Sequence, residues 1–213
     1  MTSAPVKCPS RSMLAVLFLP ALSVVYVCAL AQHPQPGIAV TPPGKITNFE
    51  TKDNLKSFHH LDCVDLTALT TDDTPADIYP AVRTCIDHGD FERAVRLFAV
   101  AGLYGRFDTL RVLDVSAHQA ISVLGMTSFS DLSQGAKEQF QATFKASLSS
   151  DRLVELCGQA RKLGPPTYYP TYMTQHGMSA FTGKGGGLKE DLNVAEAWDS
   201  SLSTYLHCLP SPK

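Results

Sequence analysis

The sequence lacks any run of basic residues and any alternation of basic with aromatic residues. Surfaces that bind nucleic acid need clustered lysine and arginine to contact the phosphates, so nucleic acid is not an expected partner. Charged residues make up only 18% of the chain, whereas hydrophobic residues make up 44%. That balance excludes disorder of the whole chain, and 213 residues can bury one sizeable core. One main domain is therefore expected.

Signatures of metal and phosphate sites are also missing. No Cys-x-x-Cys pair and no His-x₃₋₅-His partner is present, as zinc sites would need. His59-His60-x-Asp62 offers ligand residue types, but adjacent histidines of an extended segment point to opposite sides. The glycine-rich loop at 183–187 lacks the Gly-x₄-Gly-Lys-Ser/Thr order of a phosphate-binding loop. No metal and no cofactor is therefore expected.

The N-terminus has the pattern of a secretory signal peptide, residues 1–31. Two basic residues precede the apolar run 13–31, which closes with the small-residue pattern Ala29-Leu30-Ala31. We predict cleavage before Gln32 and a periplasmic or secreted location, without stable membrane insertion after cleavage. The alternative is an uncleaved anchor, because the run is about as long as a minimal bilayer span; Pro20 and the small-residue end favour cleavage. Cleavage removes two basic and no acidic residues and moves the formal charge from −2 to −4.

If the chain is exported, its cysteines are expected to form disulfides. The mature chain keeps four of them, an even number in an oxidising compartment, which predicts two disulfides. Among the three possible pairings we predict Cys63 with Cys85 and Cys157 with Cys208. These would tie the segment before the first helix to that helix, and the last helix to its packing partner. Paired cysteines cannot act as nucleophiles.

The composition next indicates a linker and then an ambiguous segment. Residues 32–44 hold four prolines and two glycines, typical of an extended linker. We place the start of a helical domain, residues 45–213, directly after it. Between residues 45 and 71 the apolar positions fit neither a helical nor a strand period, so a short strand or an irregular strap held by Cys63 would satisfy them.

Helical spacing dominates the rest, and we predict a mainly α-helical domain of about six helices. The first helix is expected to start near Tyr79-Pro80, because a start at Pro75 would place Pro80 beyond the first turn. Gly89 and Asp90 can cap the end of this helix and the start of the next, which makes the two antiparallel neighbours. A third helix is expected to run without a break over 110–124.

Three further helices follow in the sequence. One is expected over 133–148, and another begins at Asp151, capped by Ser150, and ends at Gly164. The last is expected to begin at Asn193, with Glu196 completing a capping box.

The run Gly89-Asp90-Phe91-Glu92-Arg93-Ala94, continuing to Phe98 and Ala101, is similar to the turn and second helix of a tetratricopeptide-type repeat. The resemblance covers residues 78–102 and does not recur one repeat period further on. Because stable arrays need about three copies, a repeat array is not expected. It implies a single helical hairpin in which Ala94 and Ala101 allow close approach. It also implies that the hairpin binds other proteins or peptides.

Two sets of polar residues are candidates for chemistry. Asp114 and His118 lie four residues apart, so on a helix the carboxylate could orient the imidazole. Ser116 lies on a different side, which excludes a local Ser-His-Asp arrangement, and a structural hydrogen bond with Arg111 is the main interpretation. His176 is interpreted either as a semi-buried histidine or as the polar member of a recognition surface.

The most interface-like feature is the cluster of Tyr168, Tyr169 and Tyr172 between prolines. Tyrosine brings a large contact area at a low cost in conformational entropy. Together with His176 these tyrosines form the predicted partner-binding surface. The alternative is a strap packed over the core.

The expected function is that of an exported protein-binding protein, and within that class an immunity or inhibitor protein that neutralises a secreted toxin. No catalytic residue is assigned. One alternative is a periplasmic hydrolase or cell-wall enzyme that uses Asp114, His118 and His176. Another is an envelope-assembly protein in which the segment 13–31 stays attached.

Overall fold

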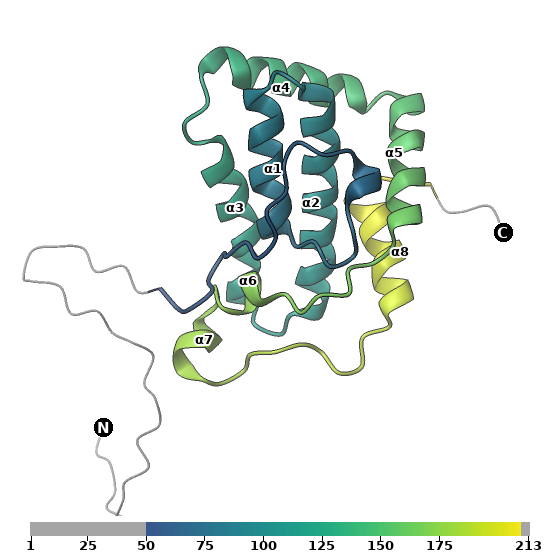
Figure 1. Cartoon of the computed structure of the whole chain (residues 1–213). Coiled ribbons are helices and arrows are strands. Elements are labelled where there is room, and N and C mark those ends of the chain that lie inside the picture. The colour runs from purple at the N-terminus through teal and green to yellow at the C-terminus, as the bar shows by residue number, and fades with distance from the viewer. Residues whose placement is uncertain (1–49, 210–213) are drawn as a thin grey trace, which may run out of the picture. The chain divides into compact units, whose positions relative to one another are not determined.

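A computed structural model describes residues 50–209, which form an all-helical domain (Figure 1). This part of the chain contains eight α-helices, two short 3-10 helices and no strand; a single antiparallel bridge joins Val112 and Leu188. The predicted α-helical class is confirmed. The predicted signal peptide (1–31), its cleavage before Gln32 and the linker (32–44) lie outside the described residues.

The first two helices, α1 (Pro75–Asp87) and α2 (Phe91–Arg111), lie side by side as the predicted hairpin (Figure 1). Gly89 adopts a φ of 78°, and Asp90 caps α2 by accepting a hydrogen bond from the Arg93 N–H. Buried small residues, including Ala94 and Ala101, line the hairpin. The helical hairpin is therefore formed, whereas its kinship with tetratricopeptide repeats stays a prediction.

The predicted start of α1 near Pro80 is wrong, because a capping box fixes the start five residues earlier. The Thr74 hydroxyl accepts from the Asp77 N–H, and the Asp77 carboxylate accepts from the Thr74 N–H and hydroxyl at 2.8 and 2.7 Å. The same carboxylate also accepts from the backbone of Phe58 and His59. These bonds outweigh the backbone donor that is lost at Pro80, which lies inside the helix.

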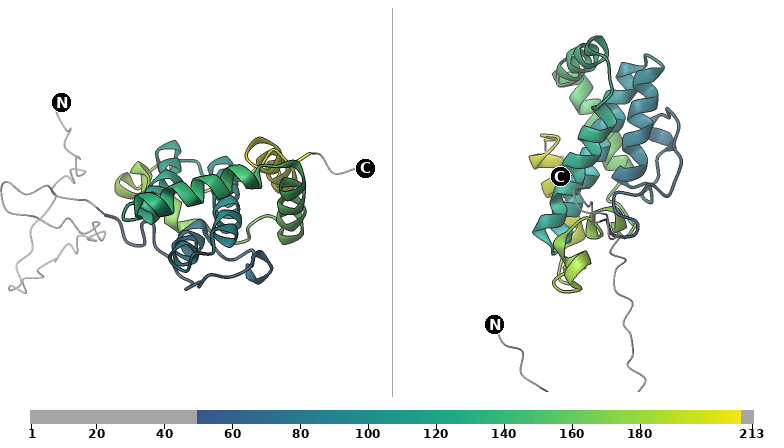
Figure 2. Two further views of the ribbon diagram at one scale, coloured as in Figure 1. Left: turned by 90° about the horizontal axis from the view of Figure 1, so that it is seen from above. Right: turned by 90° about the vertical axis from the view of Figure 1, so that its left-hand side faces the viewer.

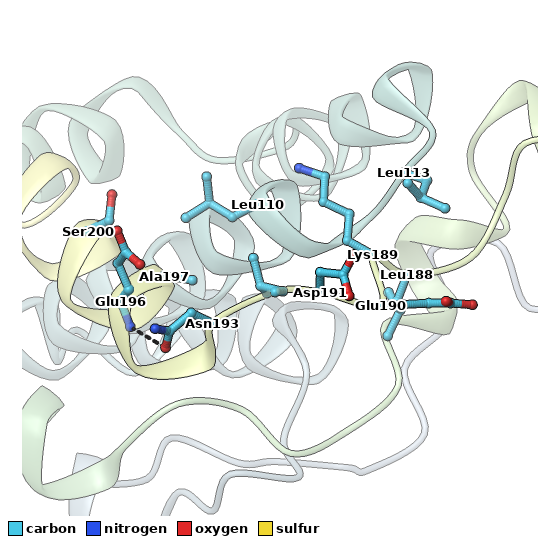
Figure 3. A pocket seen from close by; sticks show the side chains of 11 residues that line it. Leu110, Leu113, Leu188, Lys189, Glu190, Asp191, Asn193, Glu196, Ala197 and Ser200 are labelled. Carbon is cyan, nitrogen blue, oxygen red and sulfur yellow. Dashed lines mark hydrogen bonds between the residues drawn. The ribbon is translucent and has the colours of Figure 1, made fainter.

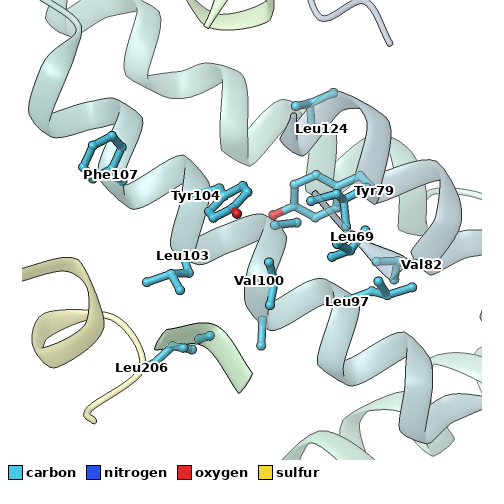
Figure 4. Packing of buried hydrophobic residues seen from close by; sticks show 14 of the residues in the cluster. Leu69, Tyr79, Val82, Leu97, Val100, Leu103, Tyr104, Phe107, Leu124 and Leu206 are labelled. Atoms are coloured by element: carbon cyan, nitrogen blue, oxygen red, sulfur yellow. The ribbon is translucent and has the colours of Figure 1, made fainter. Parts of the chain in front are cut away.

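Helix α2 is the centre of the domain, and it packs against α1, α4 (Gln134–Ser147) and α8 (Val194–Thr204). Its inner faces are fully buried and contribute the large side chains seen in Figure 4, among them Leu97, Leu103, Tyr104 and Phe107. The predicted fourth helix and the predicted Asn193 cap are confirmed, although only the Asn193 half of that capping box is present.

The expected unbroken helix over 110–124 is wrong. Helix α2 runs through Arg111, and Val112 then adopts an extended conformation before η2 (Val115–Gln119) and α3 (Ala120–Phe129). The Leu113 N–H donates to the Gly187 carbonyl at 3.0 Å, and the Lys189 N–H donates to the Arg111 carbonyl at 2.8 Å. Backbone pairing with a distant segment thus replaces the helical bonds that the local pattern predicted.

A cluster of aromatic rings joins α1 and α2 to the two helices that follow. Helix α3 lies beside α1, and α4 crosses the end of the hairpin (Figures 1 and 2). The Phe98 ring lies edge-on to four rings, with centroid distances from 5.5 to 6.0 Å, contributed by Tyr79, Phe129, Phe140 and Phe144. Phe98 therefore connects four helices and does more than fill the gap inside the hairpin.

Both predicted disulfides are present. Cys63–Cys85 attaches the irregular segment 50–71, with its short η1 (Leu66–Ala68), to α1. Cys157–Cys208 attaches α5 (Ser150–Leu163) to the end of the chain that follows α8. Segment 50–71 is a strap, and α5 begins one residue before its predicted start, with Ser149 as its cap.

None of the helices between residues 50 and 209 combines the length and the apolar composition needed to cross a membrane.

Candidate functional site

The tyrosine cluster lies on a segment that crosses the domain and includes α6 (Thr171–Thr174). Tyr172 is 1% exposed, and its hydroxyl donates to Oδ2 of Asp108 at 2.5 Å. The half-buried Tyr168 donates to the same oxygen at 2.9 Å. Both hydroxyls are donors that a buried carboxylate needs, so Tyr172 belongs to the core, whereas a partner-binding role for Tyr168 stays a prediction. The alternative given for the tyrosine segment, that it packs over the core, describes Tyr172.

The carboxylate that the tyrosines contact belongs to a buried ion pair. Oδ1 of Asp108 lies 2.7 Å from both Nε and Nη2 of Arg111. The guanidinium lies over the rings of Phe107 and Tyr168, 5.2 and 5.0 Å from their centroids. Burial raises the pKa of Asp108, while Arg111 and the two tyrosine hydroxyls oppose that rise. Burial also raises the pKa of Tyr172, so its hydroxyl keeps its proton and donates.

Tyr169 is the one member of the cluster with an exposed ring, at 55% exposure. It lines a cavity of about 310 Å³ together with residues of the strap and of the start of α1, including Phe58, His59 and Asp72. His176 is half-buried, and its Nδ1 lies 2.9 Å from Oδ1 of Asn54. Burial lowers the pKa of His176, so the ring is neutral at pH 7. A binding role for Tyr169 and His176 stays a prediction.

The candidate acid–base residues each bond a different partner. Asp114 accepts from the Ser116 N–H and hydroxyl and from the Ser179 N–H, at distances between 2.6 and 2.9 Å. Nε2 of His118 lies 3.1 Å from the Val112 carbonyl. The expected contact between Asp114 and His118 is not among the hydrogen bonds of the described residues, because the helix that would have aligned them is interrupted.

Burial alone would raise the pKa of Asp114, but the hydrogen bonds from Ser116 and Ser179 outweigh it and lower the pKa to about 2. The Ser116 hydroxyl also accepts from the Met178 N–H, at the start of α7 (Met178–Thr182). Asp114 therefore fixes α7 against η2, and we interpret it as a structural residue.

His59-His60-x-Asp62 does not converge on a metal site. Nδ1 of His59 lies 3.1 Å from Oδ1 of the buried Asp73, while Asp62 accepts from the Cys63 N–H. No group of three or more histidine, cysteine or acidic residues suitable for a metal occurs within residues 50–209.

An open groove of about 780 Å³ lies between the end of α2, the segment 188–193 and α8 (Figure 3). We call it the acidic groove. Its apolar floor and polar rim are formed by Leu110, Leu113, Leu188, Lys189, Glu190, Asp191, Leu192, Asn193, Glu196, Ala197 and Ser200.

Within residues 50–209, the carboxylates on the rim of the acidic groove have no partners. Glu190, Asp191 and Glu196, like the nearby Asp199, make no side-chain hydrogen bond or ion pair with any residue between 50 and 209. Apart from Glu50, every other acidic side chain in that range has a partner, as in the exposed pair of Arg83 and Asp87 and the interhelical pair of Arg152 and Glu92. Sequence reasoning missed this site. Its only local signal was the Lys-Glu-Asp run between two leucines.

A second hollow, of about 530 Å³, lies over the aromatic cluster and is lined by Tyr79, Phe98, Phe129, Phe140 and residues of α3 and α4. Its walls are mostly apolar, and Met126 on its edge is 66% exposed. It contains no cluster of polar groups that could orient a ligand.

Comparison of the chain with protein-family models, with curated proteins and with solved structures finds no match.

Proposed function

We propose that this chain is an exported protein-binding protein that contacts its partner through the acidic groove. The observation that carries the proposal is the combination of a leucine floor with rim carboxylates that have no partner within residues 50–209. Protein interfaces combine an apolar centre with a polar rim in the same way.

Two features support an exported location. The sequence carries the signal-peptide pattern, and both cysteine pairs are at disulfide distance, which fits an oxidising compartment. In addition, two of the polar residues that suggested catalysis bond to separate local partners, Asp114 to Ser116 and Ser179 and His118 to the Val112 carbonyl. A binding role therefore has more support than the hydrolase alternative.

Within this class we propose an immunity or inhibitor protein. The expected mature chain has a formal charge of −4, and the acidic groove concentrates unpaired negative charge, which suits the blocking of a basic surface. If this is right, co-expression with a secreted toxin encoded nearby should rescue growth, and the two proteins should co-purify. If this chain fails to rescue growth against every toxin candidate encoded nearby, the immunity role is refuted.

The binding role is tested by capture from the native lysate and culture medium. The bait is the exported protein with both disulfides intact, compared with Leu113→Ser on the groove floor and with Tyr169→Ala on the tyrosine surface. Leu113 is already 46% exposed, so its replacement should leave the fold intact. Val154→Ser on α5, where the side chain is 67% exposed, is the matched control.

A stoichiometric partner that is lost with Leu113→Ser and retained with Val154→Ser would support the groove. A partner lost only with Tyr169→Ala would transfer the site to the tyrosine surface. Absence of any partner would refute the proposed function.

A further inference from the structure

The chemistry of the acidic groove limits what its occupant can be. Glu190, Asp191 and Glu196 project around an apolar floor to which Leu110 and Leu113 contribute (Figure 3). The only basic residue among the lining residues is Lys189. An occupant must therefore cover leucine side chains at its centre and present positive charge at its edges.

The adjoining surface extends the same negative charge. Asp199 and Glu196 line a neighbouring hollow together with Arg161, whose guanidinium donates to the Leu209 carbonyl. Four carboxylates therefore face two cations over the combined surface, Lys189 and Arg161. Because the four carboxylates have no hydrogen bonds or ion pairs within the described residues, a cationic ligand would not need to break an existing pair to reach them.

The apolar surface also continues past the end of the groove. Leu113 is followed by Val115, which is 74% exposed, and Met178 on α7 is 61% exposed. The Met178 N–H donates to the Ser116 hydroxyl, so these exposed apolar residues belong to segments that lie against each other. The groove and its continuation form an elongated surface, which fits a chain segment better than a compact small molecule.

We propose that the acidic groove binds a basic amphipathic segment of a partner protein, with the apolar face of the segment on the leucine floor and its lysine or arginine side chains against Glu190, Asp191 and Glu196. This inference rests on the proposed function and specifies the chemistry of the partner at the same site. Amphipathic helices bind in hydrophobic grooves through side chains spaced at i, i+3, i+4 and i+7. The charged rim would fix the orientation of the segment and speed its association. An anionic lipid surface would be repelled by the same rim.

The probe is a 14-residue peptide with leucine at the helical anchor positions and lysine elsewhere. Two control peptides carry glutamate in place of lysine, or the same residues in scrambled order. Binding to the exported protein, with both disulfides oxidised, is measured by fluorescence anisotropy at low and high salt. We expect the lysine peptide to bind at least tenfold more tightly than either control, and its affinity to fall as salt rises.

Two matched triple variants test the site. In one, the rim is neutralised by Glu190→Gln, Asp191→Asn and Glu196→Gln. In the other, the same change in net charge is made at exposed acids on other surfaces, by Asp131→Asn, Glu138→Gln and Glu155→Gln. The rim variant should bind the lysine peptide at least tenfold more weakly, whereas the control variant should stay within about twofold of the wild type. Circular dichroism establishes that both variants are folded.

Equal affinity for the lysine and glutamate peptides, equal loss in the two triple variants, or no binding of the lysine peptide would overturn the inference. The proposed function fails separately. A captured partner that is lost with Leu113→Ser but retained by the rim variant would support the binding role and refute the inference that the bound segment is basic. Peptide binding that depends on the rim, without any captured partner, would support the ligand chemistry and remove the proposed function.

Discussion

The hydroxyl of Tyr172 lies 2.5 Å from Oδ2 of Asp108, a residue 64 positions earlier in the chain. This contact joins α6 to the last turn of α2 and places a tyrosine, predicted to face a partner, in the core. Asp108 also accepts from Arg111 and Tyr168, so four side chains form one buried network.

Replacing Tyr172 by Phe should lower the free energy of unfolding by about 1.5–3 kcal/mol, because a buried carboxylate loses one of its donors. Tyr168→Phe should cost less, since Tyr168 is half-buried and its hydrogen bond to Asp108, at 2.9 Å, is longer than that of Tyr172. The measurement is urea unfolding at pH 7, followed by circular dichroism. Tyr169→Phe should stay within about 0.5 kcal/mol of the wild type. An unchanged midpoint for Tyr172→Phe would show that the network contributes little to stability.

Arg111→Ala should destabilise the protein by about 3–5 kcal/mol, because it leaves the Asp108 carboxylate buried without its cation. The comparison is Arg83→Ala, which breaks the exposed pair with Asp87 and should cost about 1 kcal/mol or less. Both values come from denaturant unfolding. Similar losses in the two variants would contradict the special position of the buried pair.

The two disulfides should contribute unequally to stability. Cys157–Cys208 closes a loop with a sequence separation of 51, and Cys63–Cys85 one of 22. Loop-closure entropy predicts losses of about 4 and about 3 kcal/mol for the respective double serine variants. Thermal unfolding of each variant, and of the wild type with and without reductant, measures the difference. A larger loss from the shorter loop would indicate that packing at Cys63 and Cys85, and not loop entropy, dominates.

Asp114 should make stability sensitive to acid. Its folded-state pKa of about 2 lies below the ordinary value of 3.8, so its stabilising contribution is complete above about pH 4 and is lost as the pH falls toward 2. The wild type should therefore lose stability over this window, and Asp114→Asn should lose less. Urea midpoints at pH 7, 4, 3 and 2 provide the measurement. Asp131→Asn, which leaves the Asp114 bonds intact, should follow the wild type.

Features encoded by neighbouring residues were predicted from the sequence. Asp90 and Asn193 cap the helices that they are expected to cap, because a cap joins a side chain to a backbone N–H three residues later. The disulfide pairing also followed from the sequence, since it joins segments that the expected helices leave near each other. The position of Pro80 alone predicts a start of α1 that is too late, because the Thr74–Asp77 capping box fixes the start at Pro75.

The sequence by itself determined the helical class and several helix ends, since these depend on local hydrogen bonding, and it favoured the observed cysteine pairing among three possible ones. Only the tertiary structure decided where the helix expected over 110–124 breaks, because the backbone of Leu113 bonds to Gly187, far along the chain. It likewise decided that Tyr168 and Tyr172 bond to Asp108, and that Leu110 and Leu113 meet the acids of 188–193 and α8 in one groove. Periodicity assigns a residue to a face of its own helix, whereas these contacts depend on which distant segment covers that face.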